Sequence, residues 1–314
     1  MIFEGSEKKL EIVVNRSVNL LDWPESRWLN LIETAGTRIL SKIEISNSAR
    51  AYLLSESSLF VWNDRLTMIT CGTTTLVDSA VKACEYLRND EIAAIFYERK
   101  NEYFPHFQKT DFFSDAKKLN TMVGGRAYRL GHADDHHLFL FHSDREFQPR
   151  KSDTTLEILM YGLQGHAREV FNSQNRDTKW IRAQTGVDRI FSGFEIDDHA
   201  FSPIGYSLNA LNRDRYYTIH VTPQDESPYV SFETNLNSRR DIEKTVGAVV
   251  EVFQPRAFDV VYFDSASERE IFDVRGYVLR GAVREKLACG FNVYYSHHSA
   301  KDTVETNACL LELE

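Results

Sequence analysis

The sequence predicts an α+β fold in which two β-sheets pack face to face and helices cover their outer faces. Segments that alternate apolar and polar residues recur along the chain, and a few amphipathic helical segments interrupt them. Two such rounds follow one another without a linker between them. The chain has 314 residues and is 42% hydrophobic, so it can bury a large core. We therefore expect one domain over residues 1–314.

The first round contains two helical segments among its strands. Pro24 opens the first helix and Gly36 closes it. Its apolar face consists of Trp28, Leu31, Ile32 and Ala35. Thr75 and Asp78 have the spacing of a capping box for the second helix. The face of that helix consists of Leu76, Ala80, Cys84 and Leu87. The predicted strands are Leu10–Val14, Ile39–Ile45, Tyr52–Trp62 with a break inside it, Leu66–Cys71 and Ile92–Tyr97.

The second round repeats this pattern without a clear internal sequence repeat. A helix is predicted to start at Ser238 and to end at Pro255. Its apolar face consists of Ile242, Val246, Val249, Val250 and Phe253. The predicted strands are Ala127–Leu130, Leu138–His142, Leu156–Gly162, Tyr216–Val221, Tyr229–Thr234 and Phe258–Phe263. Each round contains strands and a covering helix, which suggests that each round forms one of the two sheets.

Bulk properties exclude several classes of partner. The net charge of −9 and the pI near 5.6 disfavour nucleic acid and anionic membranes. No apolar run approaches the roughly 20 residues of a spanning helix. The charged start of the chain predicts that no signal peptide is present. The four cysteines show no paired spacing, which predicts free thiols and a cytoplasmic protein.

One short stretch has a polar centre inside an otherwise apolar strand pattern. Residues 51–61 are apolar at both ends, with Ser55, Glu56, Ser57 and Ser58 between them. This pattern predicts a strand, a sharp polar break and a second strand. Such a cluster is either a polar turn or a place where function overrides folding. In the second case a strained turn holds a serine hydroxyl close to the carbonyl of the preceding residue.

A series of motifs resembles the eukaryotic-type S-adenosylmethionine decarboxylases, in the order of that family. They spread over most of the chain up to about residue 265, and the last fifty or so residues carry none of them. The motifs are Phe3 to Lys8, Leu54 to Ser58, Thr70 to Thr74, Thr155 to Met160, Gly205 to Asn209, Thr218 to Pro223 and Tyr229 to Asn235. The resemblance implies a four-layer α/β/β/α sandwich of two antiparallel sheets, built from a duplicated half.

The resemblance also implies that the chain cuts itself. The cut falls between Glu56 and Ser57, which gives a small chain 1–56, a large chain 57–314 and a pyruvoyl group made from Ser57. A base must remove the α-proton of Ser57, and His220 matches that base. Ser207 matches a serine that assists processing. Taken without the family, His220 is better explained as a strand residue with a hydrogen bond.

In the mature enzyme of this family, the pyruvoyl ketone forms a Schiff base with the substrate amine and accepts the electrons released with carbon dioxide. Cys71 matches the proton donor of the family, although a lone cysteine is otherwise a common core residue. Glu4 and Glu7 match two carboxylates that the family needs near the pyruvoyl group. Without the family they would be a solvated acidic start to the chain.

The resemblance places the substrate, S-adenosylmethionine, between aromatic rings. Phe3 and Phe201 match the pair that stacks on the adenine, Glu56 matches a contact to the adenine edge, and Leu54 lies beside it. At Gln224 the family usually has glutamate, which accepts hydrogen bonds from the ribose hydroxyls. An amide accepts through one oxygen and carries no charge. Either the neighbouring Asp225 takes over this role, or the ribose is held more weakly, or the substrate differs.

A regulatory site is implied as well. Animal members bind putrescine in an acidic cavity between the sheets. The matching positions are Glu11, Phe96, Asp153, Thr155, Glu157 and Glu233, with Arg99 nearby. Ile69 replaces a lysine of the animal pattern, and Lys9 stands where plant members, which do not need putrescine, carry arginine. We expect Lys9 to replace the diamine; the alternative is a Lys9 that points to solvent on an edge strand.

Three further interpretations stay open. A dense group of histidines and aspartates over His132–His137, with His142, falls on a hairpin and has no known metal spacing, so we expect no metal. His297 and His298 are expected to form a surface pair. The chain could instead decarboxylate ornithine or arginine, or be an inactive regulatory paralogue, although Ser57, Cys71, Ser207 and His220 are all present. A homodimer of processed chains is a further alternative for the assembly.

Overall fold

Two eight-stranded antiparallel sheets form the centre of the computed structural model, which describes residues 3–236, 242–265 and 273–301. The first sheet has the order β2-β3-β4-β5-β1-β6-β8-β7 and the second the order β10-β11-β12-β13-β9-β14-β16-β15. When the two orders are aligned, each strand of the first sheet corresponds to the strand numbered eight higher in the second. This correspondence supports the predicted duplication and confirms the sandwich.

The strands of the first sheet are β1 (Lys8–Val14), β2 (Ile39–Ile45), β3 (Ala49–Leu54), β4 (Ser57–Val61), β5 (Arg65–Thr70), β6 (Ile92–Lys100), β7 (Gly125–Gly131) and β8 (His137–Ser143). Those of the second sheet are β9 (Thr155–Tyr161), β10 (Glu195–Ala200), β11 (Tyr206–Asn212), β12 (Arg215–Thr222), β13 (Tyr229–Thr234), β14 (Ala257–Asp264), β15 (Tyr277–Lys286) and β16 (Asn292–Ala300).

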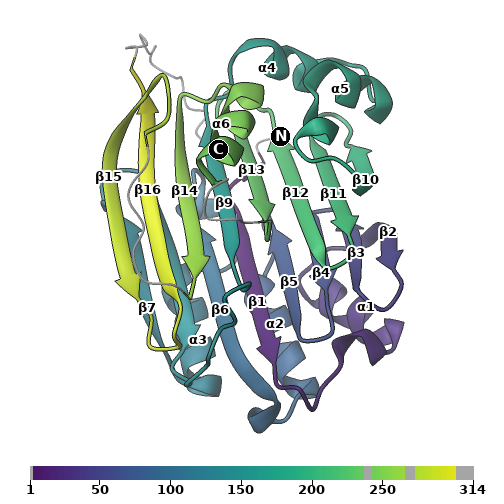
Figure 1. Ribbon diagram of the computed structural model, residues 1–314, viewed down its shortest axis with the longest axis vertical. Helices are drawn as coiled ribbons and strands as arrows, with labels where there is room; N and C mark the ends of the chain where they lie inside the picture. Colours follow the sequence, from purple (N-terminus) through teal and green to yellow (C-terminus); the bar gives the residue numbers. More distant parts are fainter. Residues whose placement is uncertain (1–2, 237–241, 266–272, 302–314) are drawn as a thin grey trace.

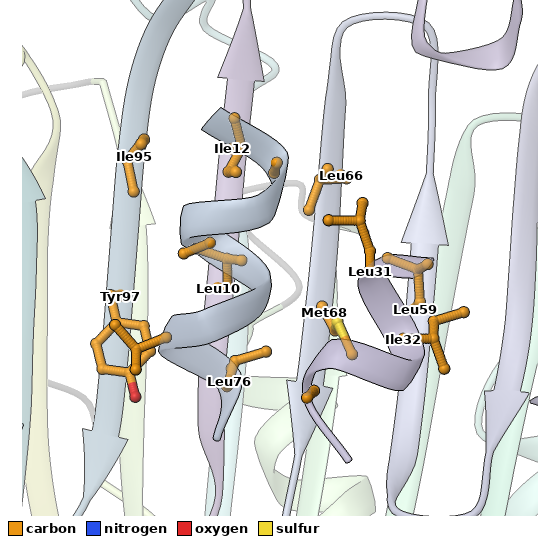
Figure 2. Packing of buried hydrophobic residues seen from close by; sticks show 14 of the residues in the cluster. Leu10, Ile12, Leu31, Ile32, Leu59, Leu66, Met68, Leu76, Ile95 and Tyr97 are labelled. Atoms are coloured by element: carbon orange, nitrogen blue, oxygen red, sulfur yellow. The ribbon is translucent and has the colours of Figure 1, made fainter. Parts of the chain in front are cut away.

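Helices cover the outer face of each sheet (Figure 1). The first sheet carries α1 (Glu25–Thr34), α2 (Leu76–Tyr86) and α3 (Phe112–Val123). The second carries α4 (Gly165–Asn172), α5 (Thr178–Thr185) and α6 (Ile242–Phe253). In Figure 2, Leu31 and Ile32 of α1 and Leu76 of α2 pack on the apolar residues that the strands turn outward. The described residues contain no helix that is both long and apolar enough to span a membrane.

Alternation along the central strands decides what lies between the sheets. In β1, Leu10 and Ile12 face the helices (Figure 2), so Lys9 and Glu11 face the second sheet. An apolar face would be the simplest filling of such an interior. This interior instead holds apolar clusters at the edges and buried charged residues in the middle. Polarity alternates from Lys9 to Ile12 in β1, yet every residue of the strand is buried, because both of its faces are covered.

Several sequence predictions are corrected by the topology. The strands predicted near 127–130 and 138–142 are β7 and β8; they complete the first sheet through β6 and do not belong to the second round. The capping box at Thr75 does not form, because its side chain makes no cap hydrogen bond and Asp78 pairs with Lys118 instead. The predicted helix start at Ser238 lies outside the described residues. The thiols of Cys71, Cys84 and Cys289 are free, and Cys309 is not among the described residues.

Candidate active site

The break between β3 and β4 is the tight turn that the sequence predicts. Ser57, the first residue of β4, is buried and has a φ of +115°, a region that L-residues rarely adopt. Its hydroxyl donates to Cys71 Sγ at 3.3 Å. The carbonyl oxygen of Glu56 accepts from the backbone N–H of Cys71 at 3.3 Å. The strained serine and a polarised preceding carbonyl therefore occupy the same turn.

His220 approaches this turn from the other sheet, on β12. Its Nδ1 lies 2.9 Å from Glu7 Oε1, and its Nε2 lies 2.9 Å from Ser58 Oγ and 3.1 Å from Thr218 Oγ1. A carboxylate on one ring nitrogen fixes both the tautomer and the orientation of an imidazole. Ser231 also donates to Glu7. The imidazole is thus held between a carboxylate and the hydroxyl next in sequence to Ser57.

A cavity of about 320 Å³ opens between the ends of β4, β5, β11 and β12. It brings together most residues that the resemblance singled out. They are Phe3, Glu56, Ser57, Cys71, Phe201, Ser207, His220 and Gln224. Ser207 on β11 pairs in register with His220 on β12. Leu54 is not among the lining residues, because it faces the helices and belongs to the core below.

Glu4 does not line the cavity either. Its carboxylate accepts from the backbone N–H groups of Ser6 at 3.0 Å and Phe104 at 2.8 Å. Its own carbonyl oxygen accepts from Gly72 N–H at 2.8 Å. These bonds fasten the segment of residues 3–7, which carries Phe3 into the cavity wall and Glu7 to His220. Glu4 is therefore placed to position its neighbours, whereas the sequence analysis expected it beside the reacting group.

Burial shapes the protonation of the cavity. It raises the pKa of Glu56 to about 7, and Glu56 Oε2 has no hydrogen-bond partner among the described residues. Burial, together with the nearby Glu56 carboxylate, also raises the pKa of the Cys71 thiol far above its ordinary value. Cys71 consequently keeps its proton at neutral pH, as a proton donor must.

Gln224 has a contact that the sequence could not reveal. Its amide oxygen accepts the backbone N–H of Phe3 at 3.1 Å. The one acceptor of this side chain is therefore used inside the protein. It holds one wall of the cavity in place and leaves the amide NH₂, a donor, for any bound molecule.

The acidic residues expected between the sheets do come together, around Lys9. Lys9 Nζ lies 2.6 Å from Glu157, 2.9 Å from Glu233 and 3.7 Å from Glu98. It is 5% exposed on the central strand β1, so the alternative of a solvent-facing lysine is wrong. Although burial alone would lower it, these carboxylates raise the pKa of Lys9 well above its ordinary value.

Arg65 closes the outer part of the same cavity. It lies 2.9 Å from Asp153 and 3.3 Å from Glu11. With Phe96 and Thr155 also lining it, the cavity retains a free volume of only about 10 Å³. Arg99 was expected nearby but faces the helices, where it pairs with Asp115 at 2.7 Å. Ile69 pairs in register with Lys9 on the neighbouring strand.

Some residues of these sites escaped the sequence analysis. Glu98 carried a readable signal, because it stands two positions after Phe96 and so shares its face of β6. Ser58, Asn209 and Arg65 gave none, because their contacts cross between strands or sheets. Ser58 Oγ donates to Asn209 Oδ1 at 2.6 Å as well as lying beside His220.

The histidine-rich segments differ from expectation in part. His132 to His136 lie in the hairpin between β7 and β8, as predicted, while His142 is buried in β8. Among the described residues, no three histidine, cysteine or acidic side chains are grouped so as to hold a metal ion. His297 and His298 are buried on β16 and are not a surface pair. Asp259 accounts for this burial, because it hydrogen-bonds to His297.

Comparison with known proteins agrees with this geometry. Residues 1–303 match the family model of adenosylmethionine decarboxylase. The chain is 34% identical over 280 residues to the S-adenosylmethionine decarboxylase proenzyme of Leishmania donovani, covering 83% of this chain and 73% of that one. It is 35% identical over 285 residues to the proenzyme of Xenopus laevis, covering 85% and 84%. The crystal structure of the Trypanosoma brucei AdoMetDC-delta26 monomer superposes with a TM-score of 0.61 at 26% identity, over 78% of this chain and 99% of that one. This chain belongs to the adenosylmethionine decarboxylase family.

Proposed function

We propose that this chain cuts itself between Glu56 and Ser57 and then decarboxylates S-adenosylmethionine in the cavity beside the cut. It is an adenosylmethionine decarboxylase, a carboxy-lyase of polyamine biosynthesis. Its named relatives are S-adenosylmethionine decarboxylase proenzymes, which rules against the alternatives of ornithine or arginine decarboxylation and of an inactive paralogue. The observation that carries the site assignment is the strained Ser57, which lies on the same cavity as Cys71 and His220.

Self-cleavage needs three chemical steps, and the site offers protein groups for the first two. The Ser57 hydroxyl adds to the Glu56 carbonyl carbon and the Ser57 nitrogen leaves it, which turns the amide into an ester. The N–H of Cys71 stabilises the charge that develops on the carbonyl oxygen. His220 then takes the α-proton of Ser57, and the Glu56 carboxylate leaves. Tautomerisation and hydrolysis with one water release ammonia and leave the pyruvoyl group.

The residues present fit the pyruvoyl group and its substrate. When formed, that group supplies the electron sink for loss of carbon dioxide. Cys71, protonated and 3.3 Å from the Ser57 hydroxyl, is placed to return a proton to the substrate. Phe3 and Phe201 line one cavity together with Glu56 and Ser57, which supports stacking of the two rings on the adenine. Gln224 fixes Phe3 through its backbone.

Two measurements test the proposal: the masses of the purified chains and the choice of substrate. The purified protein should consist of chains 1–56 and 57–314, which we expect to remain one domain, with a pyruvoyl group blocking the N-terminus of the larger chain. Intact mass spectrometry measures this, and labelled S-adenosylmethionine, ornithine and arginine assayed side by side measure the substrate. A single uncut chain in an active preparation would refute the mechanism.

We further propose that Lys9 replaces putrescine. Its ammonium makes three ionic contacts with carboxylates that would otherwise need a bound cation, and Arg65 pairs with the two that remain, Glu11 and Asp153. Putrescine should therefore not stimulate processing or activity of the wild type. Lys9→Leu removes the internal cation, so a response to millimolar putrescine is expected to appear in that variant. Strong stimulation of the wild type would contradict this proposal.

A further inference from the structure

A further cavity lies at the opposite edge of the sandwich from the catalytic one. It has a volume of about 170 Å³ and lies between the β7–β8 hairpin and strands β15 and β16. Figure 1 shows β7, β15 and β16 together at one edge of the molecule, with β3, β4 and β12 toward the other. The side chains that line it include those of His132, Asp135, His136, Arg280, Tyr295 and His297. None of them takes part in the activity described above.

The floor of this cavity is an imidazole with a fixed orientation. His297 Nδ1 lies 2.6 Å from Asp259 Oδ1, and Asp259 is fully buried. Burial alone would raise the pKa of Asp259, but Lys100 at 3.1 Å and the bond from His297 lower it below its ordinary value. Asp259 is therefore ionised and can only accept, so Nδ1 carries the hydrogen. The lone pair of the neutral ring is then on Nε2.

That lone pair faces a second acceptor across the cavity. His297 Nε2 is 3.8 Å from Asp135 Oδ2, too far for a hydrogen bond. The other oxygen of Asp135 accepts from the backbone N–H of His136 at 2.7 Å. Within the described ranges, no donor lies within hydrogen-bond distance of either Nε2 or Oδ2. A nitrogen that carries several hydrogens fits between His297 Nε2 and Asp135 Oδ2, at about 2.8 Å from each of these two acceptors.

The walls favour an aliphatic chain behind such a nitrogen. The His136 ring stacks on Tyr161 with centroids 3.9 Å apart, and burial lowers its pKa to about 4, so it is uncharged at neutral pH. Tyr295 adds a second aromatic face, with its hydroxyl already donated to His136 O. The volume corresponds to about five or six waters at roughly 30 Å³ each, which suits an amine of three or four carbons.

Other ligand classes fit less well. A metal ion lacks a third converging ligand among the described residues. An anion would face the Asp135 carboxylate and the Nε2 lone pair. Among the described residues that line the cavity, Arg280 supplies the guanidinium; it is exposed, and its Nε donates to Ser299 Oγ at 2.6 Å. We propose that this cavity binds a small aliphatic primary amine whose ammonium donates to both His297 Nε2 and Asp135 Oδ2. The proposal is independent of the assignment of the catalytic site.

The test uses the full-length protein and isothermal titration calorimetry at pH 8 with butylamine and 1,4-diaminobutane. We expect one molecule to bind, and Asp135→Asn and His297→Gln each to weaken its affinity roughly tenfold or more, because Asp135→Asn removes the charge of one acceptor and His297→Gln replaces the basic Nε2 with an amide group. Asp135 is half exposed on a hairpin, so its variant leaves the core intact. His166→Gln, an exposed histidine on α4, is the matched control and should bind normally.

Acetate and 1-butanol separate the remaining explanations. Acetate binding that is lost in Arg280→Ala, without amine binding, would make this an anion site and overturn the proposal. Equal affinity for 1-butanol and butylamine would show that the ammonium makes no bond here. Amine binding that survives both Asp135→Asn and His297→Gln would place the amine elsewhere, and failure of the wild type to bind either amine would also refute the proposal.

Discussion

At the scale of single residues, the site depends on one serine held in an unfavourable backbone conformation. A positive φ at a residue other than glycine costs on the order of 1–3 kcal/mol, which the surrounding structure must supply. For Ser57 that structure is the pairing of β4 with both β3 and β5. Conversion of Ser57 to a planar ketone would remove its tetrahedral centre and relieve this strain. If the chain cuts itself as proposed, the folded sheet would therefore favour the product of the cut over the intact turn.

His220→Ala should block the elimination step while leaving ester formation possible. We expect the uncut chain, or its ester form, to accumulate, because no base remains to take the α-proton of Ser57. Hydroxylamine should cleave the ester, and denaturing electrophoresis measures both forms. Cys71→Ala is the matched control: it should process, at least slowly, but decarboxylate poorly. Normal processing of His220→Ala would mean that another group is the base.

Glu4→Gln separates a positioning role from a catalytic one. The amide keeps one of the two acceptors and turns its NH₂ toward a backbone donor, which costs about 1–3 kcal/mol of stability. Because residues 3–7 deliver Phe3 to the cavity, KM should rise several-fold with a smaller change in kcat. Steady-state kinetics measures the split. A large loss of kcat with unchanged KM and unchanged melting temperature would restore Glu4 to the reacting centre.

At the scale of elements, the clearest case is the contact between the N-terminal segment and the loop after β5. Gly72 has a φ of +65°, and a Cβ added to it would lie 2.9 Å from the Phe3 ring and 3.0 Å from Glu56 Oε2. No side chain can be accommodated there without moving a wall of the cavity. The glycine therefore serves the site as well as the turn.

Gly72→Ala should raise KM for S-adenosylmethionine by roughly tenfold, because Phe3 and Glu56 must shift. Gly36→Ala is the matched control: Gly36 has a φ of +84° and nothing lies within 4 Å of an added Cβ. Both changes carry a similar backbone strain, of about 1 kcal/mol, so both should lower the melting temperature. Only Gly72→Ala should change KM. An equal KM in both variants would mean that the Phe3 contact is not used in binding.

The elements that sequence reasoning found and missed have physical explanations. Buried strands such as β1 and β9 are rich in apolar and β-branched residues, and they were predicted. β10 reads Glu-Ile-Asp-Asp-His-Ala and β15 alternates half-buried and exposed residues; both are sheet edges with little apolar signal. The eight-residue helices α4 and α5 are too short to show a clear period. Strands β7 and β8 were predicted but assigned to the wrong half, because strand order is decided by non-local pairing.

For the site, the resemblance identified the residues but not their contacts. It named His220, yet the nearest hydroxyl to its Nε2 is that of Ser58. It named Lys9, yet the choice between a buried cation and a solvent-facing one required the position of β1 in the sheet. Such facts depend on register and on which sheet faces which, and neither can be read from spacing along the chain.

At the scale of the whole molecule, buried carboxylates give the uncut chain a pH-dependent stability. The pKa of Glu56 is raised from an ordinary 4.5 to about 7 by burial. A carboxyl group whose pKa is higher in the folded than in the unfolded chain binds its proton more tightly in the folded state. It therefore stabilises the fold at pH values below its pKa in the unfolded chain. That contribution is lost as pH rises through the folded pKa. Burial also raises the pKa of Glu98, one of the carboxylates around Lys9, to about 7.

We therefore expect the melting temperature of the uncut His220→Ala chain to fall as the pH rises from about 4.5 to about 7. Adding Glu56→Gln should remove part of this fall, because glutamine does not ionise. Differential scanning calorimetry over that range measures both chains. Glu25→Gln, on the exposed side of α1, is the control and should leave the slope unchanged. A double variant with the same slope as His220→Ala would exclude Glu56 as a contributor.

The position of β1 has a consequence for the lifetime of the protein. β1 lies between β5 and β6 in the middle of the first sheet, yet it belongs to residues 1–56, on the far side of the proposed cut. Before the cut, folding involves one molecule. After it, an unfolded enzyme could recover only if two separate chains met and the shorter one threaded a strand back into the sheet. If the chain cuts itself as proposed, reassembly would thus be slower than first folding, and the working life of the mature enzyme would depend on how slowly it unfolds.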